Sequence, residues 1–387
     1  MKAGVYLHIP FCKSRCSYCD FATDVYKNEE TVERYVDAVI REISDFGFRI
    51  SDPRSEIQNP KPEIDTVYFG GGTPSLLKPE QLEKILRAVR QKFSAAEDAE
   101  ITLEMNPGTV SPEKLSDYRS LGVNRASFGV QTFDERALRL LARGHDATDA
   151  RRTFEMLRRA GFDNISFDLI AGLPHQTLDD WRRNLEEALR LGPEHLSLYL
   201  LEIHEGTPLA EQIRSGRRPL PDEDLAGEMY QLMLKEVTAR GYLQYEISNF
   251  SLSGRESRHN SKYWLGHPVF AFGVSAHSFD GVGTRRANER DTARYVALIE
   301  SGESPVVEIT ELDPDARRGE YIFLRLRLNR GLDLEKFERK FGFDLTERYG
   351  AELAELSEAG LIGIDRKHLR LTDRGRLFSN EVFSLFI

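Results

Sequence analysis

Short apolar runs alternate with longer amphipathic segments through the first half of the chain. The apolar runs are rich in β-branched and aromatic residues, which is typical of buried strands. We expect strands over Val5–Ile9, Thr66–Phe69, Ile101–Met105, Arg125–Val130, Ile165–Ile170 and Leu196–Leu201. Between these runs, apolar positions recur at helical spacing. We expect helices over Glu29–Phe46, Pro79–Phe93, Pro112–Leu121, Thr148–Ala160 and Leu178–Leu191.

The expected helices carry suitable residues at their ends. Pro79 and Pro112 suit a first helical turn, and Gly122 suits the position just past a helix end. Six successive strand–helix units predict a parallel sheet with right-handed crossovers, either open or closed into a barrel. Polar and glycine-rich strand ends favour a partial (β/α)6 barrel, whose chemistry would lie at the carboxyl ends of the strands.

The pattern changes near Pro305, where helical segments and then two short strands follow one another, as in a winged helix. These helices are expected over Ala316–Leu328, Leu334–Phe341 and Leu345–Ala359, and the strands over 361–365 and 369–371. We therefore predict an α/β fold with a partial barrel over 1–250, a connecting region over 251–310 and a small α+β winged-helix-like domain over 311–387. The polar segment Ser51–Pro62 is expected to be a surface insertion.

Composition limits the function classes. The 387 residues carry a formal net charge of -10, which argues against a general nucleic-acid binder, because phosphate contacts need an excess of Lys and Arg. No run of apolar residues is long enough to span a membrane. The amino-terminal segment lacks the features of a secretory leader. We expect a cytoplasmic protein that touches membranes only peripherally, through a partner.

All three cysteines of the chain, Cys12, Cys16 and Cys19, lie in one loop with the spacing C-x3-C-x2-C. A disulfide scaffold would need more cysteines, spread along the chain. Iron–sulfur clusters are held by cysteine thiolates, and three ligands on a [4Fe–4S] cube leave one iron open. A structural zinc site is the alternative, but it would need a fourth ligand, and His8 lies on a strand with the wrong spacing.

Polar groups also stand at the ends of the later strands. The segment Gly70–Pro74 allows close approach of a ligand to the backbone. It differs from a phosphate-binding loop, because no Gly-Lys-Ser/Thr follows it and Pro74 lacks an N–H. Glu104, Gln131 and Asp168 lie at or near the ends of the next three strands.

The sequence YLHIPFC, followed by C-x2-CDF, resembles the radical S-adenosylmethionine (SAM) superfamily, in particular its oxygen-independent coproporphyrinogen oxidase-like branch. The resemblance extends over nearly the whole chain. It implies a radical SAM barrel with a [4Fe–4S] cluster on the three cysteines, SAM on the open iron, and an electron donor. The number of SAM molecules bound, one or two, stays open. The implied SAM contacts are Tyr6, the Tyr18 backbone, Gly71, Gly72, Thr73, Glu104, Gln131, Arg143 and Asp168.

Two functions within that branch compete: the oxidase of haem biosynthesis, and the haem-chaperone (HemW) members that bind haem and deliver it to haem proteins. The oxidases typically carry a fourth cysteine in C-x-C form, where this chain has Cys19-Asp20-Phe21. They also carry a segment before the cluster loop, whereas the first strand expected here begins close to Met1. The segment Arg258–Trp264 matches the H-N-x-x-Y-W motif of the chaperone members. The resemblance therefore favours the chaperone, with the oxidase as the alternative.

The motif implies haem contact through His259, Asn260, Tyr263 and Trp264. Imidazole is a common axial ligand of haem iron, aromatic rings offer apolar faces to a porphyrin, and Arg255 and Arg258 could pair with propionates. His8 and His277 are rival ligands, and a structural loop with a buried Trp and a hydrogen-bonded His is the plain alternative. The expected partners are haem, acceptor haem proteins including membrane-bound respiratory ones, and an electron donor. A homodimer is left open, and a methyltransferase acting on RNA is disfavoured by the acidic charge.

Overall fold

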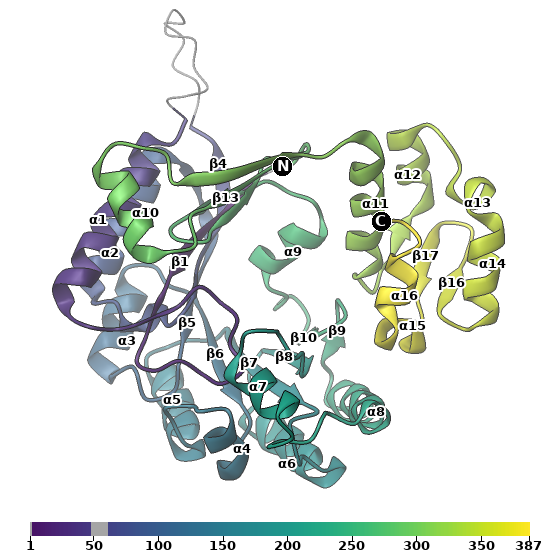
Figure 1. The fold of residues 1–387 in the computed structure, drawn as a ribbon, viewed down its shortest axis with the longest axis horizontal. Coiled ribbons are helices and arrows are strands. Elements are labelled where there is room, and N and C mark those ends of the chain that lie inside the picture. Colours follow the sequence, from purple (N-terminus) through teal and green to yellow (C-terminus); the bar gives the residue numbers. More distant parts are fainter. Residues whose placement is uncertain (1, 48–60) are drawn as a thin grey trace, which may run out of the picture.

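A computed structural model describes residues 2–47 and 61–387 of the chain (Figure 1). The predicted insertion Ser51–Pro62 lies outside the described residues except for its last two positions. In the described part, one sheet of 12 strands has the order β14-β13-β12-β11-β1-β4-β5-β6-β7-β8-β10-β9. Its centre consists of six parallel strands: β1 (Ala3–Ile9), β4 (Glu63–Gly71), β5 (Ser94–Met105), β6 (Arg125–Gln131), β7 (Ile165–Ala171) and β8 (His195–Leu200).

Helices connect these strands and cover the outer face of the curved sheet (Figure 1). They are α1 (Glu29–Asp45), α2 (Pro79–Lys92), α3 (Pro112–Ser120), α4 (Glu135–Leu140), α5 (Ala147–Arg159) and α6 (Leu178–Leu191). All six predicted strands and all five predicted helices of this region are present, and α4 was not predicted. The short α4 fills the long connection between β6 and α5.

The two faces of the parallel sheet differ in chemistry. On β1, Val5, Leu7 and Ile9 are fully buried in the main hydrophobic core. Because side chains alternate along a strand, Tyr6 and His8 point to the opposite face, inside the barrel. The outer face therefore supplies the apolar core, and the inner face is free to carry polar groups.

The chain after β8 returns to both edges of the sheet. After the helices α7 (Pro208–Arg214) and α8 (Glu223–Ala239), the strands β9 (Leu243–Gln244) and β10 (Asn249–Ser251) extend the β8 edge, and β10 runs antiparallel to β8. Beyond α9 (Arg258–Trp264), the strand β11 (Val269–Phe272) pairs parallel with β1 at the other edge. The strands β12 (His277–Phe279), β13 (Thr284–Asn288) and β14 (Val306–Glu311) follow, with α10 (Thr292–Glu300) between the last two. The region predicted as a connection thus builds part of the main sheet.

The carboxyl-terminal region has its own core around Leu326, Leu332 and Phe337. Its helices are α11 (Pro314–Leu326), α12 (Leu334–Phe341), α13 (Leu345–Arg348), α14 (Gly350–Glu358), α15 (Asp373–Leu377) and α16 (Ser379–Phe383), and its small sheet contains β15 (Leu332–Asp333), β16 (Ile362–Ile364) and β17 (His368–Leu371). The predicted single helix Leu345–Ala359 was wrong. It is broken at Tyr349, whose backbone leaves the helical region.

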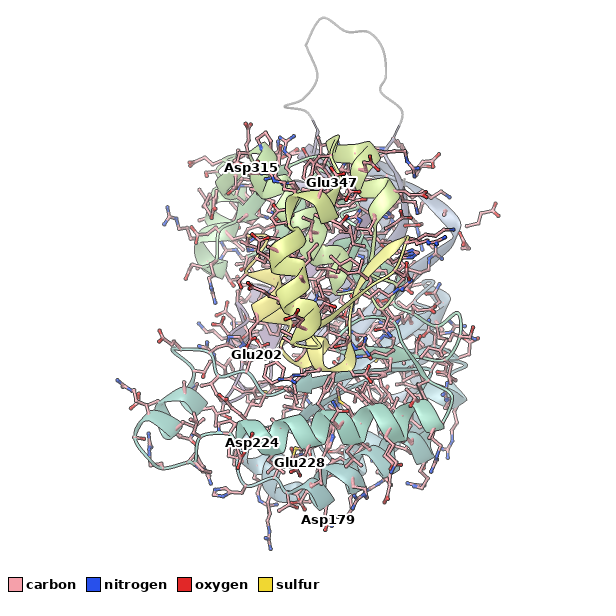
Figure 2. The ribbon with its side chains drawn as sticks, turned by 90° about the vertical axis from the view of Figure 1, so that its right-hand side faces the viewer. Asp179, Glu202, Asp224, Glu228, Asp315 and Glu347 are labelled. Atoms are coloured by element: carbon pink, nitrogen blue, oxygen red, sulfur yellow. The ribbon has the colours of Figure 1, made fainter. Side chains whose placement is uncertain are left out.

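Figure 2 shows exposed acidic side chains on two parts of the molecule: Asp315 and Glu347 lie on the carboxyl-terminal region, and Asp179, Asp224 and Glu228 lie below them on α6 and α8 of the barrel. Among the described residues, no helix has both the length and the apolar character needed to cross a membrane.

Candidate functional site

The cysteine loop begins where β1 ends and is tied to the neighbouring unit. Its first residues form β2 (Phe11–Cys12), which pairs with β3 (Asp24–Val25). The Ser17 N–H donates to the carbonyl oxygen of Leu141 at 3.0 Å, and the Ser17 hydroxyl donates to that of Leu140 at 3.0 Å. All three cysteine side chains are half-buried. The loop is therefore anchored on both sides of Cys16.

The three thiols influence one another electrostatically. Burial raises the pKa of Cys12 to about 11, and repulsion by Cys16 and Cys19 adds to the rise. Burial also raises the pKa of Cys19. Iron binds thiolates, so cluster binding must remove these protons, and it becomes more favourable as pH rises. Within residues 2–47 and 61–387, no three His, Cys, Asp or Glu side chains are gathered as a preformed metal site. The cluster assignment therefore rests on the chemistry of three clustered thiols.

A hydrogen-bond network links two of these cysteines. The Arg143 Nη1 donates to Cys16 Sγ at 3.4 Å, and its Nη2 donates to Asn106 Oδ1 at 2.6 Å. The Asn106 Nδ2 donates to Thr73 Oγ1 at 2.7 Å, and that hydroxyl donates to Cys12 Sγ at 3.5 Å. A guanidinium and a hydroxyl placed in this way stabilise thiolates, which fits an anionic cluster. The buried Arg143 Nε has no partner in the described chain, so it can donate to one further acceptor.

The glycine segment after β4 crosses the cysteine loop at close range. The N–H groups of Gly72 and Thr73 donate to the carbonyl oxygens of Ile9 and Phe11, both at 2.8 Å. A Cβ at Gly72 would lie 2.6 Å from the Pro10 carbonyl oxygen, so only glycine fits there. The Gly72 N–H is therefore engaged within the chain. The small size of Gly72 is what the structure uses.

Two acids face the barrel interior. Glu104 accepts from the Tyr68 hydroxyl at 2.6 Å and from the Gly71 N–H at 3.1 Å. Burial raises the pKa of Glu104 to about 7, and the nearby Asp168 contributes to the rise. Burial likewise raises the pKa of Asp168, although a hydrogen bond from Ser197 opposes the shift. A positive ligand charge would favour the ionised form of both acids.

A buried cation lies among these acids. Arg125, at the start of β6, is only 1% exposed, and it lowers the pKa of both Glu104 and Asp168 against the larger effect of burial. Its Nε and Nη1 have no hydrogen-bond partner in the described residues. Arg125 and Asn106 were not predicted from the sequence as site residues. The alternation of side chains could have found them, because Arg125 shares a strand face with Gln131, and Asn106 stands two positions after Glu104.

Three further predicted SAM contacts are Tyr6, Tyr18 and Gln131. The Tyr6 ring stacks on Tyr68 with centroids 6.0 Å apart, and its hydroxyl is 3.3 Å from His8 Nδ1. Tyr18 packs against a small apolar cluster that includes Leu141. Gln131 has a left-handed backbone with φ of 65°. A residue with a Cβ rarely adopts that conformation, at a cost of about 1–3 kcal/mol, and such residues gather at functional sites.

The H-N-x-x-Y-W segment meets the barrel interior from the side opposite the cysteine loop, and its His259 ring stacks on Tyr68 with centroids 5.0 Å apart. It forms α9, whose Arg258 and His259 N–H groups donate to Glu100, in the middle of β5 and level with Thr66 of β4. Lys262 donates to the carbonyl oxygen of Lys2 at 2.9 Å, at the beginning of β1. The helix therefore closes the amino-terminal end of the barrel, whereas the cysteine loop lies at the carboxyl end. The structure does not bring these two motifs together.

His259 is a fully engaged side chain in this place. It is 1% exposed, its Nδ1 lies 2.9 Å from Thr66 Oγ1, and its Nε2 lies 3.2 Å from the Tyr263 hydroxyl. Burial lowers the pKa of His259 to about 3, so the ring is neutral. An iron ligand at His259 would first have to lose one of these hydrogen bonds. Trp264 is covered by Arg327, whose guanidinium lies 4.3 Å from the ring centroid.

The other predicted haem groups are also partly engaged. Arg255 forms an ion pair with Asp163 at 3.4 Å, and Arg258 forms one with Asp98 at 3.3 Å. His8 is buried, and its Nε2 donates to the Ala22 carbonyl oxygen at 2.9 Å. The rival ligand His277 is exposed.

Comparisons with known proteins decide the family. Residues 6–188 match the Radical SAM superfamily, and residues 312–378 match the HemN C-terminal domain. The chain is 36% identical over 385 residues to the heme chaperone HemW of Bacillus subtilis (strain 168), covering 99% of both chains. The chain belongs to the HemW family of radical SAM proteins. It is also 32% identical to the heme chaperone HemW of Escherichia coli (strain K12), covering 99% of this chain and 98% of that protein.

A relative whose name marks it as mitochondrial is similar to a comparable degree. Radical S-adenosyl methionine domain-containing protein 1 of Bos taurus is 35% identical, and the match covers 97% of this chain and 85% of that protein. Among solved structures, coproporphyrinogen III oxidase (HemN) from Escherichia coli superposes with a TM-score of 0.85 at 24% identity, over 100% of this chain and 90% of that one. This likeness confirms the predicted radical SAM fold. Membership of the superfamily implies SAM and a [4Fe–4S] cluster.

Proposed function

We propose that this HemW family member is a haem chaperone, which binds a [4Fe–4S] cluster, SAM and haem and passes haem to haem proteins. The observation that carries the proposal is similarity over the full length to several proteins named heme chaperone. It is supported by a loop that offers three thiols, with Asp20 and Phe21 following Cys19.

In this proposal, Cys12, Cys16 and Cys19 hold the cluster, which supplies one electron to SAM when both are bound. The Thr73 and Arg143 donors stabilise the thiolates of Cys12 and Cys16. The remaining predicted contacts surround the sulfonium and its amino-acid and ribose groups; they are Tyr6, the Tyr18 backbone, Gly71, Gly72, Glu104, Gln131 and Asp168.

Haem contact by α9 stays a prediction that the geometry supports only weakly. Its four motif residues, His259, Asn260, Tyr263 and Trp264, stand at the end of the barrel away from the cysteine loop. In barrels of this kind the chemistry lies at the carboxyl ends of the strands, and the opposite end serves stability. We therefore propose that α9 first of all seals the barrel.

The proposed partners follow from the function. An electron donor must reach the cysteine loop, and acceptor haem proteins, including membrane-bound ones, must reach bound haem. Contact with a membrane would then be peripheral and made through the acceptor.

The test is an anaerobic haem titration of the cluster-reconstituted protein, in which the Soret band reports binding. In a second step, transfer of the bound haem to apomyoglobin, used as a probe acceptor, is measured. We expect saturable one-to-one binding and transfer of haem at a rate above that of free haem. Absence of saturable binding would contradict the proposal. Consumption of coproporphyrinogen in the presence of SAM and a reductant would instead identify an oxidase.

A further inference from the structure

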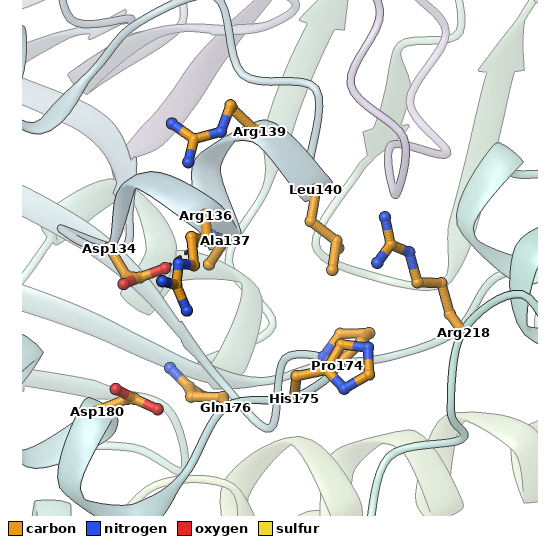
Figure 3. Close-up of a pocket in the computed structure, with 10 residues that line it drawn as sticks. All are labelled: Asp134, Arg136, Ala137, Arg139, Leu140, Pro174, His175, Gln176, Asp180 and Arg218. Carbon is orange, nitrogen blue, oxygen red and sulfur yellow. Dashed lines mark hydrogen bonds between the residues drawn. The ribbon is translucent and has the colours of Figure 1, made fainter.

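A cavity of about 520 Å³ opens between α4 and the turn that joins β7 to α6 (Figure 3). This volume is within the range of roughly 300–1,000 Å³ that small-molecule and cofactor sites occupy. The turn follows the carboxyl end of β7, so the cavity lies on the same side of the sheet as the cysteine loop. None of its lining residues belongs to the predicted site.

His175 stands at the centre of this turn. Its backbone is left-handed, with φ of 66°. Residues with a Cβ seldom adopt this conformation, and those that do are often found at functional sites. The side chain is exposed, and no hydrogen bond to it is found within the described chain. An imidazole that is held at a cavity wall and has both nitrogens available can ligate iron.

The cavity is bordered by more cations than anions. Arg136, Arg139 and Arg218 line it, and no ion pair engages them within residues 2–47 and 61–387. The two lining acids are already occupied, because Asp134 accepts from the Ala137 N–H at 2.8 Å and Asp180 pairs with Arg183. The surplus of guanidinium groups favours a ligand that carries carboxylates.

A buried donor also faces the cavity without a partner. Gln176 is 8% exposed, and its Oε1 accepts from the Leu173 N–H at 3.2 Å. Its Nε2 is buried and has no hydrogen-bond partner in the described part of the chain. Figure 3 shows this nitrogen on the side of Arg136. A buried N–H without a partner costs free energy, and an acceptor on a bound ligand would satisfy it.

The apolar wall connects the cavity to the cysteine loop. Figure 3 shows Leu140 above Pro174 and His175, with Arg218 approaching from the other side. The Leu140 carbonyl oxygen accepts from the Ser17 hydroxyl, between Cys16 and Cys19. Tyr18 and Leu140 pack against the same small apolar cluster. A flat apolar ligand seated here would therefore border the cluster loop.

We propose that this cavity is the haem site, with His175 as an axial ligand of the iron and Arg136 and Arg218 as partners of the propionates. The proposal rests on the proposed haem-chaperone function and places the ligand away from His259. The lining combines an available imidazole, guanidinium groups that are in no ion pair within the described residues, an unsatisfied amide donor and an apolar patch of Ala137, Leu140 and Pro174. Of the guanidinium groups, Arg218 donates through Nε to Gln212 Oε1 at 3.4 Å, which leaves its terminal nitrogens for a propionate.

The decisive experiment is a haem titration of the full-length, cluster-loaded protein and its His175→Gly variant. Glycine removes the imidazole and suits the left-handed backbone, so folding is preserved. We expect the variant to bind haem about tenfold more weakly, corresponding to one lost ligand interaction of about 1.4 kcal/mol, and its Soret band to shift. Free imidazole added to the variant should restore the wild-type spectrum. His204→Ala, which removes an exposed histidine outside the cavity, is the matched control and should bind as wild type does.

The outcomes separate the two proposals. If the wild-type protein binds no haem, the haem-chaperone function fails. If wild type binds haem and His175→Gly shows the same affinity and spectrum, the function stands and this site is overturned.

The propionate partners are tested with the double variant R136Q/R218Q. It should bind haem at least about tenfold more weakly, because both charged partners of the propionates are removed. Haem dimethyl ester, which lacks the carboxylate charges, should bind wild type and the double variant equally. An equal loss for haem and its ester would overturn the role of the two arginines.

Discussion

The thiols of Cys12, Cys16 and Cys19 lie in one short loop. Two of them receive hydrogen bonds, one from Thr73 just after β4 and one from Arg143 in the turn after α4. Removing one thiol leaves too few ligands for a cube, and the donors around it cannot replace a sulfur. We expect each single Cys→Ala variant to lose the visible absorbance and the iron of the reconstituted protein.

The control for this prediction is Ser14→Ala, a change in the same loop that removes no thiol. It should keep both the absorbance and the iron content. Retention of a wild-type spectrum in any of the cysteine variants would contradict the cluster assignment.

Glu104 gives the site a pH dependence. Its pKa of about 7 lies above the unfolded value of 4.5, so its contribution to stability is fully present below pH 4.5 and is lost as pH rises through 7. The ionised form that appears above pH 7 attracts the positive sulfonium of SAM. We expect SAM affinity to rise about tenfold between pH 6 and 8. Glu104→Gln should abolish this rise.

Glu42→Gln is the matched control in the SAM titration. Burial also raises the pKa of Glu42 to about 7, but its partners are Tyr295, Asn288 and the Gly273 N–H, away from the SAM site. The variant should therefore keep the pH dependence of SAM binding. A pH dependence that survives in Glu104→Gln would mean that another group controls it.

At the scale of single elements, α9 closes the amino-terminal end of the barrel, and its side chains hold it there. His259 bridges Thr66 and Tyr263, and Lys262 forms an ion pair with Asp65 at 2.5 Å. His259→Ala removes two buried hydrogen bonds and a ring stacked on Tyr68. We expect it to lower the free energy of unfolding by about 2–4 kcal/mol and to leave haem affinity unchanged.

Chemical denaturation and the haem titration together check this prediction. Asn260→Ala, on the same helix, is the control, because the Asn260 side chain makes no hydrogen bond within the described residues. It should cost less than about 1 kcal/mol. If His259→Ala were as stable as wild type but lost haem, the motif would be a haem site after all.

At the scale of the whole molecule, the carboxyl-terminal region is attached to the β8 edge of the barrel. Glu246 is fully buried and pairs with Arg327 at 3.2 Å. Backbone bonds join the same segments, including the Asn329 N–H to the Tyr245 carbonyl oxygen at 3.0 Å. Arg327→Ala would leave a buried carboxylate without its cation. We expect a loss of about 3–5 kcal/mol in unfolding free energy and faster proteolysis between the two regions.

The control is an ion pair of similar geometry on the surface. Arg34 pairs with Glu300 at 2.8 Å, but both side chains are about half exposed. Arg34→Ala should therefore cost at most about 1 kcal/mol. Equal losses for the two variants would show that Glu246 is not the attachment point. The boundaries of the three predicted parts, 1–250, 251–310 and 311–387, stay a prediction.

By itself, the sequence determined the features that depend on neighbours along the chain. The alternation of apolar runs and amphipathic segments predicted each parallel strand and its helix, because burial of one face is a local pattern. The cysteine loop is contiguous, so its chemistry could be predicted from spacing alone. The polar residues at successive strand ends could be grouped, because parallel strands bring their carboxyl ends to one edge.

Only the tertiary structure decided what depends on chain segments that are far apart. It placed α9 at the amino-terminal end of the barrel, because residues 258–264 pack against β1 and β4 rather than against the nearby β10. It gathered Arg136, His175 and Arg218 from three connections into one cavity. It joined Thr73, Asn106 and Arg143 into a single network. The direction of a side chain and the packing between distant segments are set by closure of the sheet, and no local pattern encodes them.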